Sequence, residues 1–443
     1  MSDIDIENLA YVDIQHDALA VFDDVEQGVI LSEDIWISGY KAGESSVHGK
    51  AKITFREGGG SDITSRDGVK VDRSLSSKTN FNVSIPKLNI DNCTVKYPKQ
   101  IIHPPYKKTS NLDAPLHINS LDLNPKSPHV VIGGPDGYCV ILPTSLNSTE
   151  KEVQLKGHVG DVRDVKWFPS GEVILTASSD LSIRIYGREG INPRTLRGHT
   201  RVITSTHILG VGKQILSASK DGTIRLWDVG KGEEVKRWLI GLESRMTIEG
   251  MIVVEDPQLL QLLGLGLGEG EGEGEERVMI LNVQDGIWIQ PFSSTEKGSG
   301  WFIKNHLNSQ LISMDQKEGL VVLGYMNGVV DIIDLVRLRK PSTSKEAEVE
   351  VGMGRIKRIK RNESPIYSLY LTSTSTGDED EVDLYVGTSS GLPCLLGITI
   401  REYGFEVETK EELAGWEATG IECWGKVGDN VWCAGGEGGL RRY

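Results

Sequence analysis

A histidine, a serine and an aspartate near the middle of the chain have the types needed for nucleophilic catalysis. They are His199, Ser217 and Asp221, and such a trio can activate a serine hydroxyl. The histidine and aspartate also occur one step earlier in the chain, as His158 and Asp180. An active site occurs once, whereas a structural network recurs with its repeat. The pattern therefore predicts a buried hydrogen-bond network and no catalytic residue.

A second candidate for chemistry is the glycine-rich run from Gly264 to Glu276, since such loops can hold phosphates. Its glycines all occupy even positions, so no glycine lies five residues after another, as G-x-G-x-x-G requires. The run has no lysine, and its glutamates would repel phosphate. We expect a poorly ordered acidic loop and no cofactor. The histidines and five cysteines are scattered without metal-ligand spacing, so we also expect no metal.

The elements that position the His–Ser–Asp set come from a repeat. Gly157 recurs at Gly198 and Asp180 at Asp221, in both cases 41 residues later. A period of about 40–45 residues, with G-H early and W-D late, resembles the WD-repeat propeller. By this resemblance, Trp227 joins His199, Ser217 and Asp221 in one network. In the preceding unit Tyr186 replaces the tryptophan, which predicts a weakened network around His158 and Asp180.

Turn signals extend the repeat along the chain. Tight turns between apolar strands are predicted at Asp136, Asp180, Asp221, Asp285, Asn327, Ser390 and Glu437. The fold class is thus all-β: a seven-bladed WD-repeat β-propeller over residues 86–443, with a small N-terminal domain over 1–85. Two long steps indicate insertions near 259–277 and 340–354. The last blade lacks a fourth strand, so we expect a strand within 92–106 to close it.

The formal net charge of −15 disfavours nucleic acid as a partner and favours basic protein surfaces. No apolar run is long enough to cross a membrane, and the acidic N-terminus does not resemble a signal peptide. We therefore expect a cytoplasmic protein, with the nucleus as a second location. One basic run, Gly354 to Asn362, is interpreted as a solvated edge strand. A nuclear address or an RNA contact is the alternative.

The complete layout resembles the proteasomal ATPase-associated factor family. The likeness rests on an N-terminal domain, a seven-bladed ring with only Leu155–Asp228 well marked, and the terminal sequence "GLRRY". Members of that family are WD-repeat chaperones of the 26S proteasome regulatory particle. The resemblance implies a non-enzymatic protein, monomeric alone, that binds the C-terminal domain of a proteasomal AAA-type ATPase subunit during assembly.

Partners of propellers commonly bind the loops that enter the inner strands. Counting from Gly157 and His158 predicts contacts at these positions: Asn119, Asp161, Arg163, Thr204, Tyr367 and Glu422, with Trp416 as a possible aromatic anchor. Two other functions stay open. One is another WD scaffold, such as a ubiquitin-ligase substrate receptor or a ribosome-assembly factor. The other is a propeller enzyme, which would need carboxylates, histidines or metal ligands on several inner strands, and we expect none there.

Overall fold

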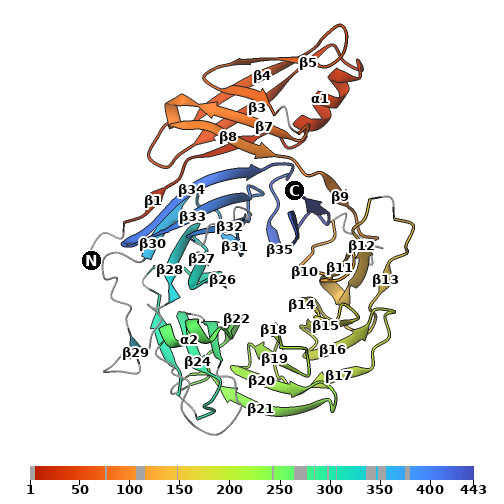
Figure 1. Cartoon of the computed structure of the whole chain (residues 1–443), viewed down its shortest axis with the longest axis vertical. Helices are drawn as coiled ribbons and strands as arrows, with labels where there is room; N and C mark the ends of the chain where they lie inside the picture. The colour runs from red at the N-terminus through yellow and green to blue at the C-terminus, as the bar shows by residue number, and fades with distance from the viewer. Residues whose placement is uncertain are drawn as a thin grey trace.

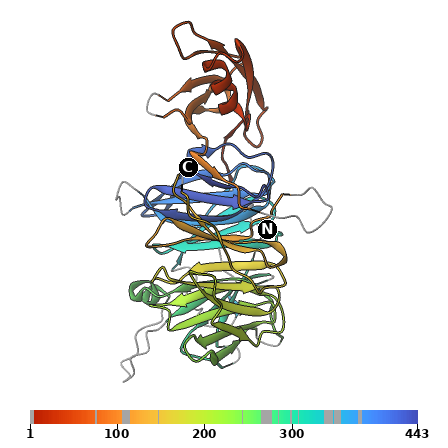
Figure 2. The same ribbon diagram turned by 90° about the vertical axis from the view of Figure 1, so that its right-hand side faces the viewer.

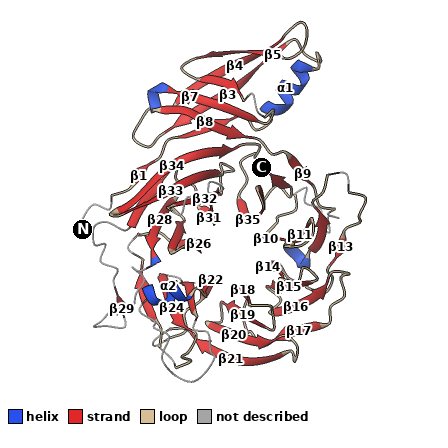
Figure 3. Ribbon diagram, viewed as in Figure 1, coloured by secondary structure: helices blue, strands red, loops and turns tan. Residues whose placement is uncertain are grey.

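The computed structural model contains seven four-stranded antiparallel units arranged around a central opening, with a separate domain at one edge (Figure 1). It describes residues 5–74, 77–105, 115–146, 148–241, 244–263, 277–283, 285–296, 299–305, 307–335, 346–347, 356–374 and 380–443. Strands make up nearly all of the regular structure (Figure 3). This is the expected all-β, seven-bladed propeller with a small N-terminal domain.

Each blade runs from an inner strand beside the opening to an outer strand at the rim (Figure 1). Blade 1 contains β10 (Ser120–Leu123), β11 (His129–Gly133), β12 (Cys139–Pro143) and β13 (Val153–Gln154). Blade 2 contains β14 (Val162–Trp167), β15 (Val173–Ser178), β16 (Ser182–Gly187) and β17 (Arg194–Arg197). Blade 3 contains β18 (Ile203–Leu209), β19 (Gln214–Ser219), β20 (Thr223–Asp228) and β21 (Glu233–Leu239). Blade 4 contains β22 (Ile248–Val254), β23 (Val278–Val283), β24 (Gly286–Pro291) and β25 (Trp301–Lys304).

The remaining blades follow the same order. Blade 5 contains β26 (Leu311–Lys317), β27 (Leu320–Tyr325), β28 (Val329–Asp334) and β30 (Ile356–Lys360). Blade 6 contains β31 (Ile366–Ser373), β32 (Glu381–Thr388), β33 (Cys394–Arg401) and β34 (Gly404–Leu413). Blade 7 contains β35 (Ile421–Val427), β36 (Asn430–Gly435), β37 (Leu440–Arg442) and β9 (Gln100–Ile102). All seven predicted turn residues lie between the second and third strands of a blade.

The second strand of each blade is buried on both faces, because neighbouring blades cover it on either side. In β19, five of the six residues of "QILSAS" are buried, and β15 shows the same pattern with "VILTAS". Such strands read as continuous apolar runs with small residues, instead of alternating apolar and polar positions. This burial supplies most of the hydrophobic contacts between blades.

The ring closes by pairing the chain's last strand with an early one. β9 lies antiparallel to β37, with Ile102 opposite Leu440 and Gln100 opposite Arg442. The segment 92–106 therefore contributes the fourth strand of blade 7 through only three of its residues. Tyr106 itself lies outside the described residues. Pairing removes the open edge that blade 7 would otherwise expose.

The N-terminal domain extends further than residue 85. One of its sheets is formed by β2 (Tyr11–Ile14), β3 (Ser32–Tyr40), β4 (Val47–Phe55) and β5 (Ser61–Arg66). The other is formed by β6 (Lys70–Arg73), β7 (Asn80–Ile85) and β8 (Ile90–Lys96). The helix α1 (Ala18–Glu26), which the alternating pattern did not predict, packs into the core of the domain. β8 and Tyr97 belong to the same core, so a boundary at residue 85 is wrong.

Two short parallel strand pairings join the N-terminal domain to the ring. The domain lies above blade 6 in Figure 1, and Figure 2 shows it at the same end of the molecule. β8 lies parallel to β34, so the sheet of blade 6 continues into the domain. β1 (Glu7–Asn8) lies parallel to β30 of blade 5. Between them, the buried Arg361 guanidinium donates to both oxygens of the buried Glu412 carboxylate, at 2.6 and 2.5 Å. Glu412 also accepts the Val12 N–H at 3.1 Å, which ties β2 to blade 6.

The basic run is not a solvated edge strand. Residues 356–360 form β30, and β1 covers its outer edge. The Arg358 side chain is buried and donates to Asp331 at 3.1 Å, and Arg361 is buried against Glu412. Arginines engaged in this way are unavailable to a nuclear-import receptor or to RNA. Gly354 and Arg355 lie outside the described residues.

The two predicted insertions interrupt blades 4 and 5. The first begins after β22 with the short helix α2 (Pro257–Leu262), and the chain re-enters blade 4 at Arg277. The Gly264–Glu276 run lies outside the described residues. The second lies between β28 and β30, where the described part is β29 (Glu346–Ala347), parallel to β25. In the described part of the chain, no helix is long and apolar enough to cross a membrane.

Candidate functional site

The inner strands share a β-bulge at the second residue, and this bulge defines one end of the central opening. Register shifts occur at this place in β14, β18, β22, β26, β31 and β35. A bulged residue has no hydrogen-bonded partner on the neighbouring strand. The side chains around it therefore no longer alternate regularly between the two faces of the sheet. In blade 1 the equivalent position by register is Asn119. We call these seven positions the mouth ring: Asn119, Arg163, Thr204, Glu249, Ile312, Tyr367 and Glu422.

Five of the seven mouth-ring residues were predicted as partner contacts from the sequence, and Glu249 and Ile312 were missed. Blades 4 and 5 carry no G-H marker from which to count. Ile312 lies 15 residues before the turn at Asn327, as Glu422 does before Glu437, so counting back from the turn would have found it. Glu249 is separated from its turn by the insertion, which hides the spacing.

Two predicted contacts hold neighbouring blades together. The Asn119 amide donates to the Val162 carbonyl at 3.2 Å, and the Thr204 hydroxyl donates to the Ile248 carbonyl at 3.1 Å. Both side chains are half-buried. Arg163 and Tyr367 are the exposed members of the mouth ring, with Tyr367 38% exposed.

The other predicted contacts differ in position. Asp161 lies in the loop before β14, half-buried, where its carboxylate accepts the Asp136 N–H at 3.3 Å. Glu422 faces His117, with 3.3 Å between the His117 Nε2 and the carboxylate. Trp416 is only 5% exposed, and the Arg441 guanidinium stacks 3.8 Å from its ring centre. The prediction of Trp416 as an exposed anchor is therefore wrong, because the ring belongs to the core of blades 6 and 7.

Carboxylates do lie on the inner strands, contrary to our expectation. The opening holds a cavity of about 320 Å³ whose lining includes Asp164 and Tyr370. Asp122 lies on the inner strand of blade 1 and Asp315 on that of blade 5. The Lys166 ammonium lies 3.3 Å from Asp164. Burial raises the pKa of Asp122 to about 6, with Lys166 opposing the shift. Burial also raises the pKa of Asp315 to about 6.

These carboxylates are used to join blades. Asp122 accepts the Trp167 N–H and Asp315 accepts the Leu371 N–H, both at 2.6 Å. Asp164 accepts both the N–H and the hydroxyl of Thr206, at 2.6 and 2.7 Å. Each bond crosses from one inner strand to the next. Among the described residues no cluster of histidine, cysteine, aspartate and glutamate is placed to hold a metal ion.

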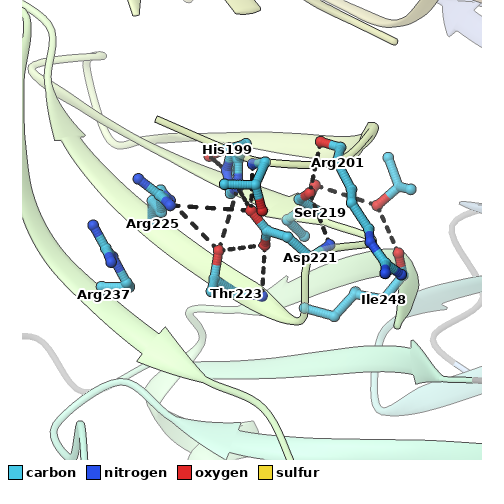
Figure 4. Close-up of polar contacts among 12 residues, drawn as sticks. His199, Arg201, Ser219, Asp221, Thr223, Arg225, Arg237 and Ile248 are labelled. Carbon is cyan, nitrogen blue, oxygen red and sulfur yellow. Dashed lines mark hydrogen bonds and ion pairs between the residues drawn. The ribbon is translucent and has the colours of Figure 1, made fainter. Parts of the chain in front are cut away.

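The histidine–aspartate set of blade 3 forms one buried chain of hydrogen bonds, which we call the relay. Figure 4 shows part of it. The His199 ring lies 2.9 Å from the Asp221 carboxylate through Nδ1 and 2.7 Å from the Ser217 hydroxyl through Nε2. The Trp227 indole N–H donates to the same hydroxyl at 2.9 Å. Asp221 also accepts the N–H and the hydroxyl of Thr223, at 2.9 and 2.5 Å. Burial alone would raise the pKa of Asp221, but the bonds from His199 and Thr223 outweigh it and hold that pKa well below its usual value.

Blade 2 repeats this relay with one connection changed. His158 lies 2.9 Å from Asp180 and 2.7 Å from the Thr176 hydroxyl. Tyr186 takes the tryptophan position, but its hydroxyl donates to the Lys156 carbonyl at 3.0 Å. The relay therefore ends at Thr176. Burial lowers the pKa of His158, and the Asp180 carboxylate opposes that shift. In both blades the hydroxyl and the imidazole are buried and fully engaged, so the set is structural.

The ring of seven blades and the buried relays define the class: this is a WD-repeat β-propeller. The WD domain, G-beta repeat model matches residues 149–187 and 190–228. Each match contains the outer strand of one blade and the three inner strands of the next: β13 with β14–β16 of blade 2, and β17 with β18–β20 of blade 3.

Curated relatives match over limited parts of the chain. Nuclear distribution protein nudF 1 of Talaromyces marneffei is 36% identical over 123 residues, which is 27% of this chain and 26% of that protein. The 26S proteasome regulatory subunit RPN14 of Saccharomyces cerevisiae is 38% identical over 84 residues, 19% of this chain and 20% of that protein. WD repeat and FYVE domain-containing protein 1 of Mus musculus is 31% identical over 115 residues, 25% and 28% of the two chains. The chain thus spans about a quarter of the length of these relatives.

Proposed function

We propose that this protein is a non-enzymatic assembly chaperone that binds the C-terminal domain of a proteasomal ATPase subunit. The observation that carries the proposal is the similarity to the 26S proteasome regulatory subunit RPN14, together with the sequence layout that resembles the proteasomal ATPase-associated factors. The similarity to nuclear distribution protein nudF 1 covers 27% of this chain and supports the fold equally well.

The side-chain chemistry supports a binding role over a catalytic one. The serine, histidine and aspartate residues of blades 2 and 3 satisfy one another in buried relays. The inner-strand carboxylates hold neighbouring blades. A catalytic group must be free to exchange protons or bonds with a substrate. These groups instead form hydrogen bonds that hold the blades together.

The partner is proposed to dock over the mouth ring. Tyr367 is exposed at this end of the opening and packs against Gly420, so its ring is held in place. Ile312 lies at the same position in blade 5, and Met326, 44% exposed, occupies the turn beside it. Of these two apolar residues, Met326 is exposed and Ile312 is half-buried. An ordered tyrosine beside apolar side chains is a common composition of an interface hot spot. We propose that the protein is a monomer before it binds, and that it acts in the cytoplasm and nucleus.

A binding assay with purified components tests this function. The full-length protein is titrated with the isolated C-terminal domain of each proteasomal ATPase, and calorimetry gives the dissociation constant. We expect one domain to bind, and Tyr367→Ala to weaken that binding by about tenfold or more, as removal of an aromatic anchor does. Tyr403→Ala is the matched control, because Tyr403 is 79% exposed in the β33–β34 turn at the opposite end of the strands.

Two results would contradict the proposal. One is that none of the ATPase domains binds. The other is an equal effect of the Tyr367 and Tyr403 substitutions, which would exclude the mouth ring. Affinity purification distinguishes the main alternative: recovery of a ubiquitin-ligase adaptor or a pre-ribosome, without proteasomal ATPases, would identify another kind of WD scaffold.

A further inference from the structure

Exposed cations gather on the loops of blades 2 and 3 that surround the mouth ring, although the whole protein carries a formal charge of −15. We call them the basic arc: Lys156, Arg163, Arg197, Arg201 and Arg245, all exposed. Within the described part of the chain, none of the five side chains forms an ion pair. Charges left free in this way are available to a ligand.

The five residues lie at the same end of the strands. Lys156 and Arg197 occupy equivalent positions, two residues after Gln154 and at the end of β17, directly before the two G-H pairs. Arg201 lies in the loop before β18, where its carbonyl accepts the Ser219 hydroxyl at 3.0 Å (Figure 4). Arg245 borders the β19–β20 turn, since a Cβ atom added at Gly222 would lie 2.9 Å from its Cβ.

Carboxylates in these loops do not neutralise the arc. Asp180 and Asp221 are bonded to their histidines inside the blades. Glu249 of the mouth ring pairs with Lys220, at 2.6 Å. Asp161 is half-buried and accepts a main-chain N–H. Asp136, exposed in the adjoining β11–β12 turn of blade 1, adds one negative charge beside the blade 2 loop. The five cations outnumber it and produce a local positive field in the described surface of these loops.

The opposite side of the mouth has the reverse charge. Over blades 6 and 7 the exposed charged groups of the loops are the carboxylates of Glu363 and Glu417, with Glu422 in the mouth ring. Glu363 is paired with Lys360, whose ammonium lies 2.7 Å from its carboxylate. Arg361 and Arg441 are buried in pairs with Glu412 and Glu437. Among the described residues, Glu417 and Glu422 have no lysine or arginine partner, so they carry the negative charge of this side. The docking face is thus divided into a basic and an acidic half.

We propose that the basic arc binds an acidic segment of the protein partner. Guanidinium groups form paired hydrogen bonds with carboxylates, and four of the five cations are arginines. The chain's own glutamate-rich run is an unsuitable occupant. It leaves blade 4 after β22 and returns at β23, at the end of the inner strands opposite to the bulges. This inference rests on the proposed docking role of the face, and it specifies the chemistry that the partner must present there.

The test uses the full-length protein and two labelled peptides. One is a fluorescein-labelled dodecapeptide of alternating glutamate and serine, and the other has glutamine in place of glutamate. Binding is measured by fluorescence anisotropy at about 50 mM salt, where screening is weak. We expect the glutamate peptide to bind, the glutamine peptide not to bind, and the affinity of the glutamate peptide to fall steeply as salt is added.

Two matched charge-reversal variants locate the site. Arg163→Glu combined with Arg201→Glu should weaken binding by about tenfold or more. Lys126→Glu combined with Lys213→Glu changes the net charge by the same amount, in exposed loops at the opposite end of the inner strands, and should change the affinity less than about twofold. Arg163→Gln with Arg201→Gln serves as a milder second variant, and circular dichroism checks that each variant is folded.

Three outcomes would overturn the inference: no binding of the glutamate peptide, equal binding of both peptides, or equal losses in the two charge-reversal variants. None of them depends on an ATPase domain. A failure of ATPase binding with intact peptide binding would therefore reject the proposed function while leaving the basic arc as an acidic-segment site.

Discussion

Removing the central hydroxyl of the blade 3 relay should destabilise the protein more than removing the equivalent hydroxyl of blade 2. In Ser217→Ala, the Trp227 indole N–H and the His199 Nε2 both lose their partner. In Thr176→Val, the His158 Nε2 loses its partner and the Arg184 carbonyl loses a long bond of 3.4 Å, whereas Tyr186 is unaffected because it bonds elsewhere. All of these groups are buried, so water cannot replace the missing bonds.

The magnitude follows from the number of polar groups left without a partner. An unsatisfied buried donor or acceptor costs about 1–3 kcal/mol. The free energy of unfolding should therefore fall by about 2–6 kcal/mol in Ser217→Ala and by about 1–3 kcal/mol in Thr176→Val. The difference between the two, about 1–3 kcal/mol, measures the indole bond that blade 2 does not have.

Urea denaturation followed by circular dichroism gives both values, provided that the slope of the transition is the same in each variant. Trp227→Phe, alone and with Ser217→Ala, completes a double-mutant cycle. Its coupling energy should be about 1 kcal/mol or more, because the two side chains share one bond. Equal destabilisation by Ser217→Ala and Thr176→Val, or a coupling near zero, would show that the Trp227–Ser217 bond contributes nothing and would refute the reasoning.

Three further perturbations test other parts of the structure. Asp122 and Asp315 have a pKa raised to about 6 from 3.8, so their contribution to stability is complete below about pH 4 and is lost as the pH rises through 6. Asp122→Asn with Asp315→Asn should flatten the loss of stability between about pH 4 and 6 in thermal melts, and an unchanged profile would contradict this expectation. Deleting Cys93–Tyr106 removes β9 and most of β8, so the propeller should unfold or aggregate, and a folded monomer by light scattering would reject its closing role. Shortening Gly264–Glu276 should leave the melting temperature and partner binding unchanged; a loss of either would assign the run a role that we do not give it.

The sequence was most informative where one local pattern recurs. The local sequence pattern repeats with the blade, because every blade packs against its neighbours in the same way. The pattern consists of the G-H and W-D pairs, the turn residues and the 41-residue spacing. The members of the blade 3 relay could therefore be named from the sequence, and the structure brings His199, Ser217, Asp221 and Trp227 within hydrogen-bond distance of one another along the relay.

Features that depend on contacts between distant segments could not be predicted in this way. β8 has the composition of a propeller strand, yet it pairs with β7 on one side and with β34 on the other. Trp416 has the sequence position of a loop residue, but Arg441 and Tyr443 cover it. The burial of Arg358 and Arg361 likewise follows from the presence of Asp331 and Glu412 far away in the chain. Pairing and burial of this kind are set by tertiary structure and leave no local signal.

The charge of the chain shows most clearly why a sum over the sequence can mislead about a binding face. A net charge of −15 predicts a partner with a basic surface. A docked partner, however, senses mainly the charges within about one Debye length, roughly 8 Å at physiological salt. Over blades 2 and 3 those charges include Arg163 and Arg201, whereas over blades 6 and 7 they include Glu417 and Glu422, which have no lysine or arginine partner among the described residues. A single partner that spans the mouth must therefore present acidic groups to one side and basic groups to the other. Such a partner can dock in only one rotational orientation around the ring, because turning it by half a revolution would place like charges together.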